Sequence, residues 1–101
     1  MNTVVVTKSE DKNEVTIDVQ GTFDHLSHQD FRAAYRSEDQ GVSYVINLHK
    51  TEYMNSSALG MLLLLREHAG GDKANISING CRENVLKTLV IAQFDKLFTI
   101  S

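Results

Sequence analysis

The sequence predicts an α/β fold in which a mixed, mostly parallel sheet of four to five strands is covered by three or more helices. Short runs rich in β-branched residues alternate with segments whose apolar residues recur every three or four positions. The resulting order is strand, strand, helix, strand, helix, strand, helix, and helical crossovers between successive strands require parallel pairing. The 101 residues contain no proline and no linker, so residues 1–101 are expected to form a single domain.

The first two strands are predicted at Val4–Thr7 and Val15–Gln20. The polar segment SEDKNE (residues 9–14) separates them and has the composition of a hairpin turn. In the second run β-branched residues alternate with polar ones, which is typical of a half-buried strand.

A helix is expected to start at Asp24 or Ser27, with Asp24 as its cap, and to end near Gly41. Its apolar residues fall roughly on one face; they are Leu26, Phe31, Ala34 and Tyr35. The run YVINL (Tyr44–Leu48) then reads as a central strand that is buried on both faces. The next residues, HKTEYMN (49–55), are predicted to form a loop.

The second helix is predicted from Ser56 to about Ala69. Its leucines occupy so much of the circumference that we expect it to be largely buried. GGDK ends it, and NISI (Asn75–Ile78) is the next strand. A third helix follows from the spacing of Val85, Leu86, Leu89 and Val90, and Lys96–Ile100 is expected to form a last short strand.

Composition narrows the range of partners. The net charge is −3 and the basic residues form no cluster, so nucleic acid and anionic membrane surfaces are not expected to bind. The apolar run Leu62–Leu65 is far shorter than the roughly 20 residues that span a bilayer, and the start of the chain does not resemble a secretory signal. With one cysteine, Cys81, there is no intrachain disulfide. We expect a cytoplasmic protein that binds another protein.

Two serines, Ser56 and Ser57, stand where the second helix begins. Ser and Asn are both preferred helix caps, so Asn55, Ser56 or Ser57 can each satisfy a free backbone N–H group, worth about 1 kcal/mol. The alternative is that one residue caps the helix while a hydroxyl stays exposed and available for modification. A phosphate there would leave the fold intact, because a helix N-terminus favours an anion, but would change the surface that a partner meets.

Other chemistry has weaker support in the sequence. Asp24, His25, His28 and Asp30 lack the spacing and the second cluster that a metal site needs, so no metal or other cofactor is expected. A hydrolase with Ser56 as nucleophile would need His49 or His68 as its base, and neither belongs to a triad motif. Cys81 stands at the start of the last helix. A cysteine in such a place is more often a small buried residue than a reactive thiol with a lowered pKa.

Three segments resemble the anti-sigma factor antagonist family, the STAS domains. They are GTFDH (Gly21 to His25), VINL (Val45 to Leu48) and MNSSALGMLLLL (Met54 to Leu65), and the similarity extends over nearly the whole chain. The resemblance implies that Ser56 is phosphorylated by a serine protein kinase, itself an anti-sigma factor of the histidine-kinase-like ATPase fold. It also implies that a PP2C-type phosphatase reverses the reaction. Outputs in the family include sigma factors, stress programmes and, in some bacteria, biofilm formation or secretion.

Two residues depart from the family pattern, because Asn55 replaces the usual aspartate and Ala58 the usual glycine. An asparagine still caps a helix but carries no charge. Gly60 costs the helix about 1 kcal/mol relative to alanine, which indicates close approach by a partner or tight packing within the domain.

We therefore predict a non-enzymatic partner-switching regulator that binds its partner until Ser56, or as second choice Ser57, is phosphorylated. The alternative is an enzyme or small-ligand-binding module that uses the same loop. A homodimer formed through an exposed part of the leucine-rich helix is a further expectation left open. The residues expected to contact the partner are Phe23, Asp24, His25, Met54, Asn55, Ser57, Ala58 and Gly60.

Overall fold

The two valine-rich segments at the start of the chain form an antiparallel hairpin. The computed structural model describes residues 3–9 and 11–101. Strand β1 (Thr3–Ser9) pairs with β2 (Glu14–Phe23), from Thr3 opposite Gln20 to Ser9 opposite Glu14. The turn is completed by Asn13, whose φ of 50° lies in the left-handed region that asparagine tolerates. Both predicted strands are confirmed; Glu10, in the predicted turn, lies outside the described residues.

The remaining strands make the sheet mixed and mostly parallel, as predicted. In the described residues β3 (Ser43–Asn47), β5 (Ile76–Asn79) and β6 (Thr99–Ile100) extend the order to β1-β2-β3-β5-β6, with β4 paired to β2. Only the β1–β2 pair is antiparallel among these strands. The run YVINL therefore is a central strand.

The prediction that residues 49–55 form a loop is wrong, because Thr51–Met54 is strand β4, parallel to the last part of β2. The Thr51 hydroxyl donates to the carbonyl of Val19 at 2.6 Å, and the N–H of Gly21 donates to the carbonyl of Lys50 at 3.0 Å. The register shifts between Gly21 and Thr22. The strand is short and joins β2 at this irregularity, so its sequence does not show the alternation that marks a strand.

The first helix is shorter than predicted. A 3₁₀ turn, η1 (His25–Ser27), leads into α1 (His28–Ala33), which ends well before Gly41. Asp24 caps the turn as expected, because its Oδ1 accepts the N–H of Leu26 at 3.0 Å. Leu26 is 70% exposed whereas Phe31, Ala34 and Tyr35 are buried, so the expectation that Leu26 shares their face is wrong. Ser27 lies four residues before buried Phe31, one helical turn, and it takes the inward position instead.

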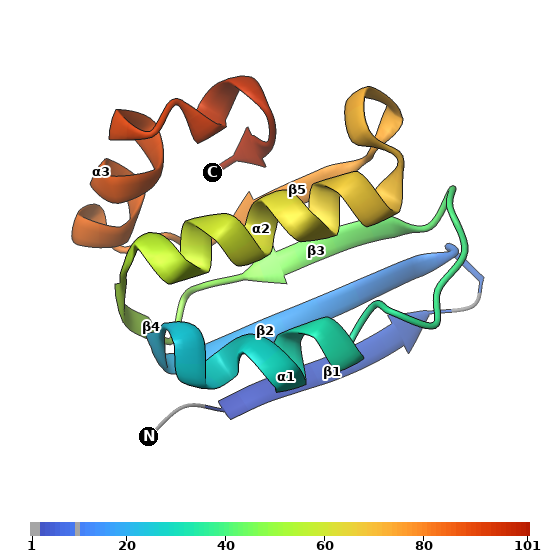
Figure 1. Cartoon of the computed structure of the whole chain (residues 1–101), viewed down its shortest axis with the longest axis horizontal. Helices are drawn as coiled ribbons and strands as arrows, with labels where there is room; N and C mark the ends of the chain where they lie inside the picture. The colour runs from blue at the N-terminus through green and yellow to red at the C-terminus, as the bar shows by residue number, and fades with distance from the viewer. Residues whose placement is uncertain (1–2, 10) are drawn as a thin grey trace.

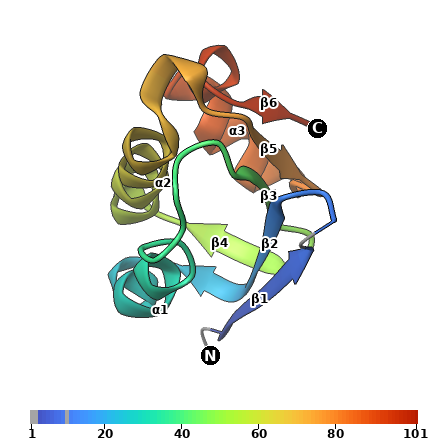
Figure 2. The ribbon, with the colours of Figure 1, turned by 90° about the vertical axis from the view of Figure 1, so that its right-hand side faces the viewer.

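Helix α2 (Ser56–Ala69) has the predicted bounds and lies with α1 against one face of the sheet (Figures 1 and 2). The expectation that it is largely buried holds for only part of its circumference. Met61, Leu62 and Leu65 are in the core, whereas Leu63 and Leu64 are 42% and 53% exposed. Four consecutive leucines cannot all face the core when the helix turns 100° per residue.

The last third of the chain returns to the sheet. After η2 (Gly71–Lys73) and β5 comes α3 (Glu83–Ile91), followed by η3 (Phe94–Lys96) and β6. The predicted third helix is confirmed. The last strand is present but shorter than the predicted Lys96–Ile100, because Lys96 belongs to η3 and only Thr99 and Ile100 pair with β5. Asn84 at the start of α3 donates its Nδ2–H to the carbonyl of Glu52 at 2.8 Å, which attaches the helix to β4.

Helices α1 and α2 cover one face of the sheet, and within residues 3–9 and 11–101 neither of them covers the other face (Figure 2). In β3, Tyr44 and Ile46 are buried towards the helices, while Val45 and Asn47 on the opposite face are half-buried. The prediction that this strand is buried on both faces is therefore wrong. None of the described helices has the length and apolar character needed to cross a membrane.

Candidate functional site

Asn55, and neither serine, caps helix α2. Its backbone is extended (φ −117°, ψ −175°), and its Oδ1 accepts the N–H of Ser57 at 3.1 Å. The side chains of Ser56 and Ser57 are both exposed, and neither hydroxyl has a hydrogen-bond partner within the described chain. Helix capping therefore does not account for the two hydroxyls.

Three of the predicted contact residues lie beneath the loop. Phe23, Met54 and Ala58 are buried, at 0%, 3% and 0% exposure. The N–H of Asn55 donates to the carbonyl of Phe23 at 3.3 Å, which joins the loop to the end of β2. Their side chains thus fix the loop from the core side.

The exposed part of the site combines the start of α2 with the turn that follows β2. His25, Ser56, Ser57 and Gly60 are exposed, and Asp24 and Asn55 are half-buried. This geometry brings the segment after Phe23 next to the serine loop, although the two are about thirty residues apart in sequence.

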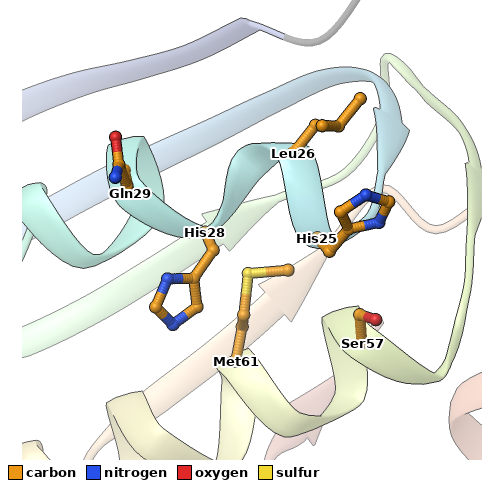
Figure 3. A pocket seen from close by; sticks show the side chains of 6 residues that line it. All are labelled: His25, Leu26, His28, Gln29, Ser57 and Met61. Carbon is orange, nitrogen blue, oxygen red and sulfur yellow. The ribbon is translucent and has the colours of Figure 1, made fainter.

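An open hollow of about 550 Å³ lies between η1, α1 and α2. Figure 3 shows the His25 ring close to the Ser57 side chain, with Met61 reaching between the two helices. The hollow is lined by His25, Leu26, His28, Gln29, Ser57 and Met61. Of these, only His25 and Ser57 are among the contact residues predicted from the sequence; Leu26, His28, Gln29 and Met61 are not. The five-residue separation of Leu26 from Phe31, which is out of phase with a helix, is the signal that identifies Leu26 as exposed.

Gly60 lies on the exposed side of α2, one turn after Ser56. A Cβ atom added to it would have no described atom within 4 Å, apart from its two chain neighbours and the backbone of its own helix. Packing within the domain therefore does not require glycine at this position. The surface it leaves open is next to the serine loop.

The electrostatics of the loop favour an anion. The first turn of α2 contains no acidic residue, and its cap is the neutral Asn55. The partial positive charge of a helix N-terminus favours a negative group by about 0.3–1 kcal/mol at an exposed site. A phosphate on either serine would lie at this end of the helix.

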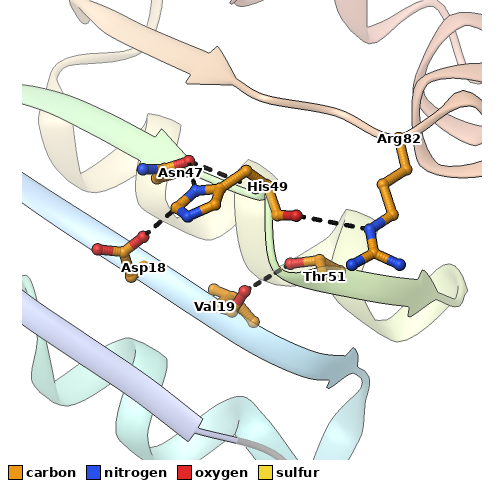
Figure 4. Close-up of polar contacts among 6 residues, drawn as sticks. All are labelled: Asp18, Val19, Asn47, His49, Thr51 and Arg82. Carbon is orange, nitrogen blue, oxygen red and sulfur yellow. Dashed lines mark hydrogen bonds and ion pairs between the residues drawn. The ribbon is translucent and has the colours of Figure 1, made fainter.

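The histidines considered as bases for Ser56 make contacts elsewhere. His49 Nδ1 is 2.5 Å from Asn47 Oδ1 and 4.0 Å from Asp18 Oδ1, and Arg82 Nε donates to the His49 carbonyl at 3.5 Å (Figure 4). His68 Nε2 is 2.8 Å from the carbonyl oxygen of Glu38, and its ring packs against that of Tyr35.

The remaining reactive groups do not add to the site. Cys81 is half-buried, and burial raises the pKa of its thiol, so the reactive thiolate is disfavoured. The described residues contain no group of three or more His, Cys, Asp or Glu side chains able to hold a metal ion.

Comparison with known proteins gives relatives in sequence and in structure. Residues 6–99 match a family model described as Mlab, STAS domain. A STAS-domain containing protein of Pseudomonas aeruginosa (strain UCBPP-PA14) is 52% identical over 94 residues, which are 92% of this chain and 93% of that protein.

Two solved structures show the same fold. The anti-sigma factor antagonist SpoIIAA in its unphosphorylated form aligns with a TM-score of 0.76 and 17% identity, over 98% of this chain and 87% of that one. An anti-sigma factor antagonist from Mycobacterium paratuberculosis aligns with a TM-score of 0.81 and 19% identity, over 99% and 85% of the two chains. The predicted mixed α/β architecture is confirmed.

Proposed function

The chain belongs to the STAS domain family, and on this premise we propose that it is a partner-switching regulator of the anti-sigma factor antagonist type. Phosphorylation of Ser56 is the switch. The observation that carries the proposal is the exposed Ser56 hydroxyl, which stands at the N-terminus of α2 while Asn55 supplies the cap.

The switch acts on the surface and leaves the fold unchanged. A phosphate adds about −1.5 to −2 charges. At the start of α2 this charge meets the positive end of the helix and no acidic side chain in the first turn, so the domain tolerates it. A partner docked over the loop would instead meet a charged, strongly hydrated group where a small hydroxyl had been.

The docking surface consists of the exposed groups around the loop. His25, Ser57 and the open side of Gly60 face solvent beside Ser56, while Phe23, Met54 and Ala58 hold the loop in place. Asp24 and Asn55 are half-buried at its margin. Since Gly60 has no packing role within the domain, close approach by the partner explains why a helix-weakening residue stands there.

In this scheme the unphosphorylated protein binds a serine kinase of the anti-sigma type with a histidine-kinase-like ATPase fold, and phosphorylation releases it. A PP2C-type phosphatase restores binding. The regulator itself is a single cytoplasmic domain without enzymatic activity or cofactor. Ser57 is the second candidate for phosphorylation, because it too is exposed at the helix start.

The test compares charge variants at Ser56 in binding to a kinase recovered by pull-down with the unmodified protein. Ser56→Ala should bind constitutively and Ser56→Asp should bind more weakly. Ser37→Asp, which adds the same charge at another exposed serine, is the matched control and should bind like the wild type. Phosphopeptide mass spectrometry after treatment with the kinase assigns the site to Ser56 or Ser57. Equal affinity of Ser56→Ala and Ser56→Asp would reject the switch.

A second candidate function is small-ligand binding, which is favoured by the hollow beside Ser57. Substituting Met61, which reaches between the two helices, should abolish ligand binding, whereas Ser56→Ala should leave it intact. The partner switch predicts instead that charge at Ser56 determines whether the protein partner binds.

A further inference from the structure

Strand β1 forms an edge of the sheet that nothing in the described chain covers. It pairs with β2 on one side and stands at the end of the strand order, at the margin of the sheet in Figure 2. It is seven residues long, and Val5 and Val6 are 42% and 45% exposed. An extended edge with free backbone N–H and C=O groups is a template for pairing with another strand.

The devices that normally block such an edge are weak in β1. It contains no proline, and its pairing with β2 continues through seven residue pairs without a register shift. Its one charged residue is Lys8, whose Nζ lies 3.1 Å from Glu38 Oε1, so the charge is paired within the chain. The opposite edge, β6, has only two residues and is protected by its shortness.

The sequence of β1 is complementary to itself. Thr3–Thr7 reads TVVVT in both directions. Antiparallel pairing about Val5 would place Val5 opposite its own copy, Val4 opposite Val6, and Thr3 opposite Thr7. Opposed β-branched residues and opposed threonines are favourable cross-strand pairs.

The two faces of the sheet agree with this register. Val4 and Val6 stand opposite Val19 and Ile17 of β2, whose side chains are buried towards the helices. Thr3, Val5 and Thr7 are therefore on the uncovered face. Pairing about Val6 instead would put Lys8 opposite Val4 of the second copy. The charged Lys8 side chain, which is paired with Glu38, would then face an apolar side chain.

We propose that two copies of this chain associate through antiparallel β1 strands, about a two-fold axis at Val5, to form one continuous sheet with the helices of both copies on the same face. Such an interface is isologous, since the same residues are used on both sides. It uses no residue of the Ser56 loop and does not depend on the proposed function. It also differs from association through the leucine-rich helix.

Disulfide trapping tests the register directly. In a Cys81→Ser background, Val5→Cys would place two cysteines directly opposite each other with Cα atoms about 4.5–5.5 Å apart, within disulfide range. Thr7→Cys is the matched control, because in the same register the two Thr7 positions are offset by four residues, about 14 Å along the strands. Rapid formation of a disulfide-linked dimer by Val5→Cys and not by Thr7→Cys supports the proposal. Equal rates, or no dimer from either, overturn it.

Sedimentation equilibrium of the otherwise unmodified chain gives an independent measurement. We expect a concentration-dependent dimer that Val5→Lys weakens by roughly tenfold or more, because like charges directly opposite each other destabilise a strand pair. Val90→Lys, at an exposed valine on α3, is the control and should leave the dimer intact. A wild-type protein that stays monomeric, or a dimer lost in Val90→Lys and kept in Val5→Lys, contradicts the proposal. Circular dichroism establishes that each variant is folded.

Discussion

Replacing Gly60 by alanine should stabilise the domain. The residue is in the interior of the 14-residue helix α2, and its surface is exposed. An added methyl group would have no described atom within 4 Å apart from its two chain neighbours and the helix backbone. Its backbone is not in the left-handed region, so alanine introduces no strain. The variant therefore gains the stability that follows from the higher helix propensity of alanine, without a steric cost.

The size of the effect follows from that difference. Glycine inside a helix is less favourable than alanine by about 0.5–1 kcal/mol. A gain of 1 kcal/mol raises the melting temperature of a 60–100-residue domain by roughly 4–8 °C. We therefore expect Gly60→Ala to melt about 2–8 °C above the wild type in thermal unfolding followed by circular dichroism, with a higher urea midpoint and an unchanged slope.

Gly41→Ala is the matched control. This position also has no described atom within 4 Å of an added Cβ, but its φ is +93°. The two substitutions thus differ in backbone conformation, and Gly41→Ala should lower the melting temperature. A Gly60→Ala variant that is unchanged or less stable would refute the inference that α2 has no internal need for glycine. A variant that is more stable but binds the proposed kinase partner less tightly would support close approach of that partner at Gly60.

Three further predictions concern other residues. Asn55→Ala should lower the free energy of unfolding by about 1 kcal/mol in urea titrations because the α2 cap is lost, whereas Asn55→Asp should retain the cap and stability. Burial, with a contribution from Glu38, raises the pKa of Tyr44 to about 12 from its ordinary 10.0, so stability should be lost as pH rises from 10 through 12. The Tyr44→Phe variant should lose less of its free energy of unfolding over this pH range. At neutral pH the substitution should break no hydrogen bond, because the buried Tyr44 hydroxyl has no partner in the described chain. Finally, because burial raises its thiol pKa, Cys81 should react with iodoacetamide more slowly in the native protein than in urea at neutral pH.

Local patterns were sufficient to predict most elements with regular periodicity, although the first helix ends earlier than its apolar spacing indicates. Apolar spacing and turn residues predict the bounds of α2, the position of the hairpin and the presence of the third helix, since these signals lie within each segment. Helix α2 begins at Ser56 because Asn55 caps it, and Asn55 was one of the three caps that the sequence allowed.

The errors occur where long-range packing decides. Strand β4 is held by Thr51 and Lys50 contacts to β2, more than 25 residues earlier, and such contacts leave no periodic signal. The exposure of Leu63 and Leu64 depends on which face of α2 meets the sheet. Likewise, the sequence indicated a functional role for the serine loop, but the hollow beside Ser57 arises only when η1 packs next to α2.

We propose that a phosphate on Ser56 controls binding while the fold is kept. The most direct test is titration calorimetry of the proposed kinase partner with the unphosphorylated and the stoichiometrically Ser56-phosphorylated protein, together with a thermal melt of each form. We expect equal cooperative melting of the two forms and binding by the unphosphorylated form alone. Equal affinity of both forms, or loss of cooperative melting on phosphorylation, would contradict the account.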